Sequence, residues 1–483
     1  MPRLISIPRP YYQLLLVISL TIFAAFLRFF KLGEWSFWGD EVFTLGSKPD
    51  GFLRSLSTSF IQATTGVLGV NEWNARLIPA LVGTITIPVL FFITARLFGS
   101  SVGLISSALL AVSTWHIYWS QNVRFYALLL LFYTLALFSF YLALEKNRPW
   151  LLLLSLILLG FAAQERMLAL VLLPVVISYL LALLILPIEK PPGLNFRNMV
   201  IYFTPGLVAA VFIAGPFLGN LGAWMTGFGR INNNPLWLFS GFIYYVGFPI
   251  ACMASFGAIF LLFKKDRAGL FFGLAAIVPL ITIMAVSLIQ FSANRYFFIS
   301  LTSWITLASL ATYELIHQQK GHARLLAVGV LVLLLGTSLS EDYLYYRYQN
   351  GNRDDWRAAF NFIQERKQSD DLVFSSEADV GDYYLGQRTF SMGNFDESAL
   401  KRKYRRAWFV TDMNTQELYP QQLAWIEEHA RQVANFDVAV RGRTFLMRVY
   451  LYDPAWETKR FQPDETISFE PVGDVVRGSL PAR

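Results

Sequence analysis

The chain has 483 residues, of which 55% are hydrophobic and only 15% are charged, and its formal net charge is +7. A soluble globular protein carries about a quarter charged residues, so this composition excludes an ordinary soluble domain and indicates a multi-pass membrane protein. The modest positive charge gives no reason to expect a nucleic-acid partner, and the single cysteine, Cys252, excludes an intrachain disulfide.

Apolar segments long enough to form transmembrane helices recur along the first 340 residues. A helix needs about 20 apolar residues to cross a bilayer. We predict about eleven spans, at 11–30, 77–98, 102–119, 125–144, 149–164, 167–187, 199–219, 236–263, 268–290, 296–315 and 324–340. The first segment lacks a small-residue cleavage site, so we interpret it as a retained span and not as a signal peptide.

Basic residues predict how these spans are oriented. With the N-terminus in the cytoplasm, every predicted inside connection carries lysine or arginine, as the positive-inside rule requires. An odd number of spans then places the region after residue 340 outside, on the same side as the loop that follows the first span. We therefore expect a cytoplasmic N-terminus and an extracytoplasmic C-terminal region.

The region after residue 340 has a mixed pattern that predicts a small α/β domain. The stretches "DWRAAFNFIQERKQ" and "QQLAWIEEHARQV" have the periodicity of amphipathic helices, and the strands are expected in "DLVFSS", "RAWFVTD" and "TFLMRVYLYD". We predict a transmembrane domain at 1–340 with an outside loop at 31–76, an extracytoplasmic α/β domain at 341–455, and a polar tail at 456–483.

Charged side chains gather at the predicted outside ends of the spans. The first outside loop carries two adjacent acids, Asp40 and Glu41, in the aromatic stretch "EWSFWGDEVF". The positive-inside rule disfavours arginine on this side, yet four arginines lie there: Arg76, Arg124, Arg166 and Arg295. Because a guanidinium group suits phosphate, this pattern predicts a lipid-linked phosphate ligand, with an acid that takes a proton from an attacking hydroxyl.

Ordinary structural roles stay open for the same residues. Each arginine could extend to lipid headgroups, and Asp40 with Glu41 could cap a helix or lie in a solvated loop. Glu72 could pair with Arg76 one helical turn later. No histidine pair supports a transition metal. A hard divalent ion could bind Asp40 and Glu41, but nothing further supports one, so we expect no cofactor.

Several stretches resemble the membrane glycosyltransferases of the C-type (GT-C) superfamily. The resemblance points to the bacterial branch related to protein O-mannosyltransferases and to the aminoarabinose transferase of lipid A. The stretches that carry it are "LRFFKLGEWSFWGDEVFTL", "NEWNARLIPALVGTITIPVLFFITARLFG", "SQNVRFYALLLLF", "ANRYFFISL" and "DDWRAAFNFI". The match is good over residues 20–145 and looser in the remainder of the chain.

The resemblance implies a polytopic α-helical enzyme of a bacterial or archaeal plasma membrane. Its donor would be a hexose or pentose on polyprenyl phosphate, reached among membrane lipids, and its acceptor a glycan, lipid or protein hydroxyl, with inversion at the anomeric carbon. The catalytic residues implied are Asp40, as general base, and Glu41. The implied donor-phosphate ligands are Arg76, Arg124, Tyr126, Arg295 and Tyr296. We expect Glu72, His116, Glu165 and Arg166 to be acceptor-binding or supporting residues, although Glu165 and Arg166 lie where this chain departs from the family's pattern.

Two other functions fit the sequence less well than glycosyl transfer. A transporter or flippase of a lipid-linked glycan would place ionisable residues at mid-span, whereas the notable charges here gather at one predicted face. A non-catalytic receptor with an external domain would not need the acid pair. Neither the sugar nor the acceptor can be predicted from the sequence.

Overall fold

The computed structural model describes residues 9–46, 55–227, 234–398, 400, 405–440 and 443–459. The chain forms two compact units. The first comprises Met1–Phe30, Pro49–Ala63 and Arg76–Asp342, and the second comprises Lys31–Lys48, Thr64–Ala75 and Tyr343–Arg483. The second unit therefore combines the C-terminal region with two pieces of the predicted first outside loop. Of the predicted polar tail, residues 460–483 lie outside the described residues.

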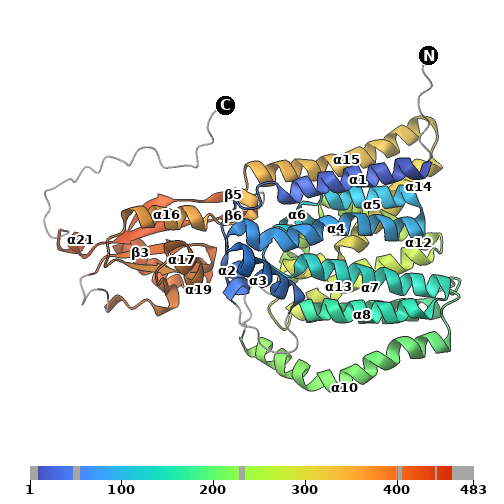
Figure 1. The fold of residues 1–483 in the computed structure, drawn as a ribbon, viewed down its shortest axis with the longest axis horizontal. Helices are drawn as coiled ribbons and strands as arrows, with labels where there is room; N and C mark the ends of the chain where they lie inside the picture. Colours follow the sequence, from blue (N-terminus) through green and yellow to red (C-terminus); the bar gives the residue numbers. More distant parts are fainter. Residues whose placement is uncertain are drawn as a thin grey trace, which may run out of the picture. The chain divides into compact units, whose positions relative to one another are not determined.

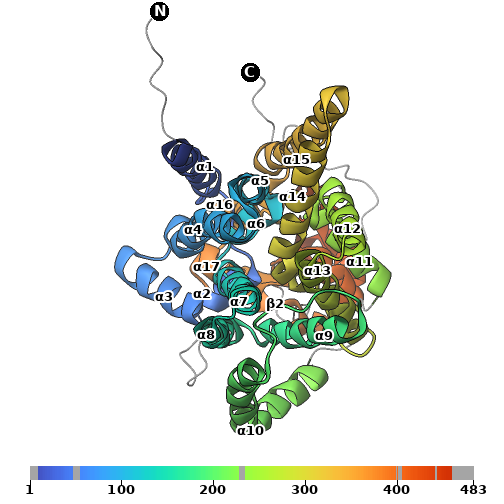
Figure 2. The same cartoon turned by 90° about the vertical axis from the view of Figure 1, so that its right-hand side faces the viewer.

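The first unit is made of long apolar helices that run along one another (Figures 1 and 2). Its helices, some of which begin or end in the second unit, are α1 (Arg9–Phe29), α3 (Leu56–Leu68), α4 (Glu72–Phe98), α5 (Ser100–Ala111), α6 (Thr114–Ser120), α7 (Tyr126–Lys146), α8 (Pro149–Glu165), η1 (Met167–Val171), α9 (Leu172–Ile185), α10 (Phe196–Gly227), α11 (Pro235–Val246), α12 (Phe248–Phe263), α13 (Arg267–Ser287), η2 (Asn294–Ser300), α14 (Leu301–Gln318) and α15 (Gly321–Arg347). In the described part of the chain, seven helices are long and apolar enough to cross a membrane, or up to nine if each of two bent pairs is one span. The polytopic helical fold is confirmed, and the count of eleven stays a prediction.

Two predicted spans are each broken into two helices, which corrects their prediction as single helices. The segment 236–263 forms α11 and α12, which are bent by 98°. The break lies at Gly247, whose φ of 92° belongs to the region that glycine favours, and Pro249 follows in the first turn of α12. The segment 102–119 forms α5 and α6, bent by 63°. Here the Ser113 hydroxyl restarts the helix by accepting a hydrogen bond from the His116 N–H.

Polar side chains join helices inside the first unit. Ser155 on α8 donates to the Ala136 carbonyl of α7 (2.8 Å), and the hydroxyls of Thr134 on α7 and Thr302 on α14 lie 3.0 Å apart. All four residues are fully buried. Such small hydroxyl residues let helices approach closely in an apolar setting while satisfying their own polar atoms. The core of this unit can therefore position charged residues at the helix ends.

The second unit contains a five-stranded mixed sheet of order β2-β1-β3-β7-β4. Its strands are β1 (Leu372–Ser375), β2 (Phe390–Ser391), β3 (Ala407–Thr411), β4 (Arg431–Asn435) and β7 (Arg448–Tyr452), with a separate hairpin of β5 (Val438–Val440) and β6 (Arg443–Phe445). Strand β1 is parallel to β2 and β3, whereas β7 is antiparallel to β3 and β4. The predicted small α/β domain is confirmed, with two local corrections. The helix predicted in "QQLAWIEEHARQV" ends at His429, and "TFLMRVYLYD" contributes to two strands.

Helices cover both faces of this sheet. The helices of this unit are α2 (Gly39–Gly46), η3 (Asn350–Asn352), α16 (Trp356–Arg366), α17 (Ala378–Leu385), η4 (Met392–Asn394), α19 (Met413–Leu418), α20 (Pro420–His429) and α21 (Pro454–Lys459). Trp408 of β3 packs on one face with residues of α16 and α17, and the next residue, Phe409, packs on the other face with Ile426 of α20. Covering on both faces explains why β3 is apolar throughout, since neighbouring side chains point to opposite sides.

Helix α2 is held by the core of the second unit. Trp38, just before it, and Val42, within it, pack against the cluster that contains Trp356 and Val380. The first two acids of the predicted site therefore lie on a short helix that rests on the C-terminal α/β core.

Candidate active site

The acid pair lies in the first turn of α2. Glu41 is fully buried and Asp40 is half-buried. The helix is fixed locally, because the backbone N–H groups of Glu41 and Val42 both donate to the Trp38 carbonyl and the Thr44 hydroxyl donates to the Asp40 carbonyl. Acidic residues in the first turn are favoured by the helix dipole. The position of Asp40 and Glu41 in the helix is thus consistent with a capping role.

A third acid, Glu377, lies against the start of the same helix. A Cβ atom added to Gly39 would be 2.0 Å from the Glu377 carboxylate, so only glycine leaves room for this contact. Burial, which is the largest cause, and repulsion from neighbouring carboxylates together raise the pKa of Glu377 to about 8. These carboxylates are Asp412, Asp40, Asp354 and Asp379. Asp40 thus belongs to a cluster of acids that repel one another, and Glu377 holds a proton at neutral pH.

The protonation of Glu377 predicts a pH-dependent stability. Between its ordinary pKa of 4.5 and its folded pKa of about 8, the folded chain keeps a proton that the unfolded chain has released. The free energy of unfolding should therefore fall as the pH rises through this range. Thermal unfolding of the full chain, followed from pH 5 to pH 9, should show a shallower decline for Glu377→Gln than for the wild type. Glu365→Gln, an exposed acid of the same unit, should keep the wild-type decline, and an unchanged slope in Glu377→Gln would contradict the assignment.

A hydrogen-bonded network fixes the loop that leads into α2. The Phe37 backbone N–H donates to the Tyr384 hydroxyl (2.7 Å), which in turn donates to the Glu72 carboxylate (2.7 Å). Arg357 forms an ion pair with the same carboxylate at 2.5 Å and donates to the carbonyls of Gly33 and Glu34. Glu72, predicted as an acceptor or supporting residue, therefore ties three segments of the second unit together. The sequence offered no sign of Tyr384, because nothing distinguishes it from the tyrosine before it.

This network also explains the "DWR" stretch noted in the sequence. The Asp355 carboxylate caps α16 by accepting from the Ala358 N–H (3.2 Å), and Trp356 is buried in the core of the sheet domain. Arg357 then points to Glu72. Three consecutive residues thus start a helix, anchor it and connect it to the loop that carries the acids.

In the first unit, basic residues gather around the start of α7. The guanidinium groups of Arg124, Arg166 and Arg295, and the Tyr296 hydroxyl, all lie close enough to the Tyr126 hydroxyl to act on it electrostatically. Arg124 and Arg166 also lie over the ring of Phe125, at 5.1 and 5.6 Å from its centroid. We call Arg124, Tyr126, Arg166, Arg295 and Tyr296 the basic cluster. Four of its members were predicted as donor ligands, and Arg166, predicted for the acceptor side, lies with them.

Aromatic rings pack directly behind the basic cluster. The ring centroids of Trp119 and Tyr126 lie 3.9 Å apart, and both rings contact Phe298 of η2. All three side chains are almost fully buried. Such a packed support limits how far Tyr126 and the adjoining Arg124 can move, and it connects α6, α7 and η2, which are distant in the sequence. A preorganised arrangement of cations is the arrangement that stabilises a departing phosphate best.

His116 is held inside the first unit by an arginine that the sequence analysis missed. Arg28, at the end of α1, is fully buried and lies 2.6 Å from Nδ1 of His116. It also donates to the carbonyls of Ala24, Leu110 and Ala111, the last two at the break between α5 and α6. His116 is therefore a packed residue that accepts a hydrogen bond from Arg28. The signal was present in "FLRFF", where an arginine stands among apolar residues.

Two further residues of the predicted site, Glu165 and Arg76, lie near the starts of helices α3 and α4. The Glu165 carboxylate accepts from the Ser55 hydroxyl (2.5 Å) and from the Ser57 N–H (3.0 Å), so it caps the start of α3. Arg76 is fully buried near the start of α4. Within the described ranges, no three histidine, cysteine or acidic side chains are placed to hold a metal ion.

Comparison with known proteins identifies the fold. Residues 56–219 match the family described as dolichyl-phosphate-mannose-protein mannosyltransferase. The crystal structure of ArnT from Cupriavidus metallidurans in the apo state is similar over 92% of this chain and 99% of that chain, with a TM-score of 0.58 and 13% sequence identity. Over residues 56–219 the chain is therefore similar to a family of glycosyltransferases, and over most of its length it shares the fold of ArnT. Its family match supports a glycosyltransferase activity, and its apolar helices agree with a multi-pass membrane protein.

Other GT-C structures share the same architecture. The oligosaccharyltransferase of Archaeoglobus fulgidus in the apo form has a TM-score of 0.57 at 10% identity, covering 86% of this chain and 71% of that chain. ArnT from Cupriavidus metallidurans bound to undecaprenyl phosphate has a TM-score of 0.52 at 13% identity, covering 90% and 97%. No curated protein matches the chain by sequence. These identities are low, so the GT-C likeness concerns the fold and leaves the substrates to be argued from this chain's own residues.

Proposed function

We propose that the chain is an inverting glycosyltransferase that moves a sugar from a polyprenyl-phosphate donor to an acceptor hydroxyl at the extracytoplasmic face of the membrane. The observation that carries the proposal is the basic cluster, in which three arginines and two tyrosines surround the start of α7. A donor of this class presents one phosphate close to the bilayer surface. Several guanidinium groups supported by packed rings are suited to hold it.

The GT-C relatives support a lipid-phosphate donor. One of the similar structures is an ArnT with undecaprenyl phosphate bound, and the matched family is described by a dolichyl-phosphate-linked sugar. Both carriers are isoprenoid phosphates. The proposal extends this donor class to the present chain and leaves the sugar itself, hexose or pentose, undefined.

The acid in the proposal is Asp40. It accepts the proton of the acceptor hydroxyl as the acceptor oxygen bonds to the anomeric carbon. The bond from that carbon to the phosphate oxygen breaks in the same displacement, and the electron pair leaves with the polyprenyl phosphate. The basic cluster and Arg76 stabilise the released charge, so no general acid is needed. One displacement inverts the anomeric centre, and a single carboxylate suffices, whereas hydrolytic glycosidases use two.

The other acids of the second unit support Asp40 in this scheme. Glu41 is buried next to it in the first turn of α2, and Glu72 fixes the preceding loop through Tyr384 and Arg357. Because Glu377 is protonated at neutral pH, the cluster carries less negative charge than its composition suggests. Asp40 therefore has fewer negative charges around it.

The proposal is tested by identifying the donor and then using it. Lipids that co-purify with the protein should include a glycosylated polyprenyl phosphate, detected by mass spectrometry. Incubation of that lipid with membranes containing the enzyme should release free polyprenyl phosphate as the sugar leaves. A chain that retains no such lipid and does not deglycosylate polyprenyl-phosphate sugars from its own host would not be a transferase of this class.

A further inference from the structure

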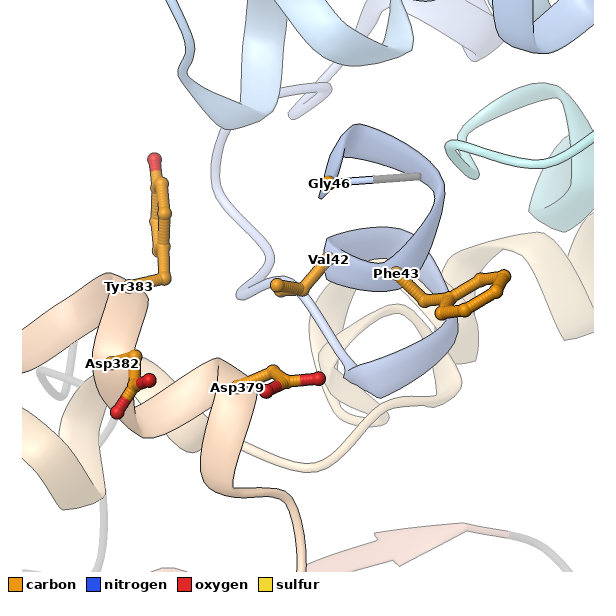
Figure 3. Close-up of a pocket in the computed structure, with 6 residues that line it drawn as sticks. All are labelled: Val42, Phe43, Gly46, Asp379, Asp382 and Tyr383. Atoms are coloured by element: carbon orange, nitrogen blue, oxygen red, sulfur yellow. The ribbon is translucent and has the colours of Figure 1, made fainter. Parts of the chain in front are cut away.

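The second unit contains a groove formed by two short helices. Helix α2 contributes Val42, Phe43 and Gly46, and helix α17 contributes Asp379, Asp382 and Tyr383 (Figure 3). The groove has a volume of about 550 Å³, which lies in the range of small-ligand sites. The stretch "DVGDYYLGQR", which contains its acidic wall, carries none of the site residues predicted from the sequence.

The groove shares a helix with the proposed base. Phe43 follows Asp40 by three residues, which places the two side chains on the same side of α2, one turn apart. Asp379, Asp382 and Tyr383 are likewise spaced to share one side of α17. Asp379, whose carboxylate points from α17 toward α2 in Figure 3, and Asp40 both act electrostatically on Glu377. The groove and the base thus belong to one acidic region.

The chemistry of the lining selects a class of ligand. Phe43 is 65% exposed, and Tyr383 is half-buried beside two exposed carboxylates. Ionised carboxylates only accept hydrogen bonds, so the groove suits a ligand rich in donors such as hydroxyl groups. Exposed aromatic rings suit the apolar C–H faces of a sugar ring. The acids around Glu377 would repel a phosphate or carboxylate placed here.

We propose that the groove between α2 and α17 binds the acceptor, and that this acceptor is a neutral saccharide whose hydroxyl is glycosylated. The inference rests on the proposed function and adds its substrate class. A phosphate-bearing acceptor is disfavoured by the charge of the groove. Asp379 and Asp382 accept hydrogen bonds from sugar hydroxyls, Phe43 and Tyr383 pack on the ring, and the hydroxyl to be glycosylated is presented to Asp40.

Gly46 offers a way to close the groove. No atom of the described residues lies within 4 Å of a Cβ atom added at this position, so a larger side chain would not enter the described core. Gly46→Trp should therefore fill the groove while the helix stays folded. The Asp379→Asn and Phe43→Ala variants remove its polar and aromatic contacts in turn.

Binding can be measured without any transfer. The protein is placed in lipid nanodiscs, because alkyl glycoside detergents carry a sugar themselves, and is probed by saturation-transfer NMR. The probes are the neutral disaccharides maltose, cellobiose and lactose, with glucose 1-phosphate and an oligolysine peptide for comparison. We expect at least one disaccharide to bind, and we expect binding to weaken at least tenfold in Phe43→Ala, Asp379→Asn and Gly46→Trp. Asp370→Asn and Tyr348→Ala, which change exposed residues elsewhere in the second unit, should bind as the wild type does.

The outcomes separate the inference from the function on which it rests. Four results would each overturn the proposal that the groove binds a saccharide. They are failure of all disaccharides to bind, equal binding of glucose 1-phosphate, preference for the oligolysine peptide, and unchanged binding in the three groove variants. Each of these results could occur while the enzyme still released polyprenyl phosphate from its donor. Conversely, disaccharide binding that depends on Phe43 and Asp379 in a protein without donor turnover would overturn the transferase and leave the groove in place.

Discussion

Replacement of Asp40 by asparagine should reduce glycosyl transfer by about 10²- to 10⁴-fold, the usual contribution of a general base. Asparagine keeps the size of the side chain and its place in the first turn of α2, but its amide cannot take up the proton of the acceptor hydroxyl. The rate should be measured with saturating donor, so that a change in donor binding does not enter. Binding of polyprenyl phosphate alone should stay within about twofold of the wild type.

The control for this experiment is another acid of the same unit. Asp370→Asn changes an exposed aspartate and should transfer at the wild-type rate. Glu41→Gln is less suitable because Glu41 is fully buried and its replacement could disturb the fold. Transfer that persists undiminished in Asp40→Asn would show that the acceptor needs no base or that another group provides it.

Removal of a guanidinium group from the basic cluster should weaken donor binding by about 10- to 100-fold. A hydrogen bond to a charged group contributes about 1.5–3 kcal/mol, and this range converts to those factors. Arg124→Gln and Arg295→Gln should both raise the Kd for polyprenyl phosphate, since both arginines act on the Tyr126 hydroxyl and lie where the phosphate is proposed to bind. Titration of nanodisc-embedded protein with polyprenyl phosphate measures this directly.

A matched control separates local from general effects of charge. Arg366→Gln removes an arginine whose partners are its neighbour Glu365 and the Phe362 carbonyl, and it should leave the Kd unchanged. Asp40→Asn should also leave the Kd unchanged. The arginine variants should therefore weaken donor binding, whereas Asp40→Asn should lower only the rate of transfer. If the arginine variants bind polyprenyl phosphate as well as the wild type does, the phosphate does not bind at the basic cluster.

Much of the fold could be predicted because its helices and strands follow from local patterns of apolar residues in the sequence. Apolar runs located most of the long helices, and the short apolar run in "RAWFVTD" located β3. The breaks at Gly247 and before Thr114 could not be recognised in the same way. Both interrupted segments stay apolar through the bend, so their hydropathy predicts a single span. The bend itself depends on a positive φ in one case and on a serine cap in the other.

The residues of the site could be predicted better than their partners. The arginines were recognisable because their predicted position contradicts the positive-inside rule, and the structure brings three of them close enough to act on the Tyr126 hydroxyl. The partners of Glu72 and Glu165 were not recognisable. Arg357 lies in the C-terminal region and Ser55 in a separate loop, and a single sequence carries no signal for contacts across such separations. Arg28 was missed for a simpler reason, since it lies within the first predicted span, at 11–30, and was given no role of its own.

The composite make-up of the second unit has a consequence for the order in which the protein matures. Residues 31–48 leave the ribosome early, but the sheet on which α2 rests is completed only when β7 has been synthesised. At 5–20 residues per second the interval is on the order of tens of seconds. During this time the segment that carries Asp40 has no folded support, so a nascent or prematurely terminated chain would be inserted in the membrane yet inactive. A C-terminal fragment expressed alone would lack this segment and the basic cluster as well, so it should be inactive.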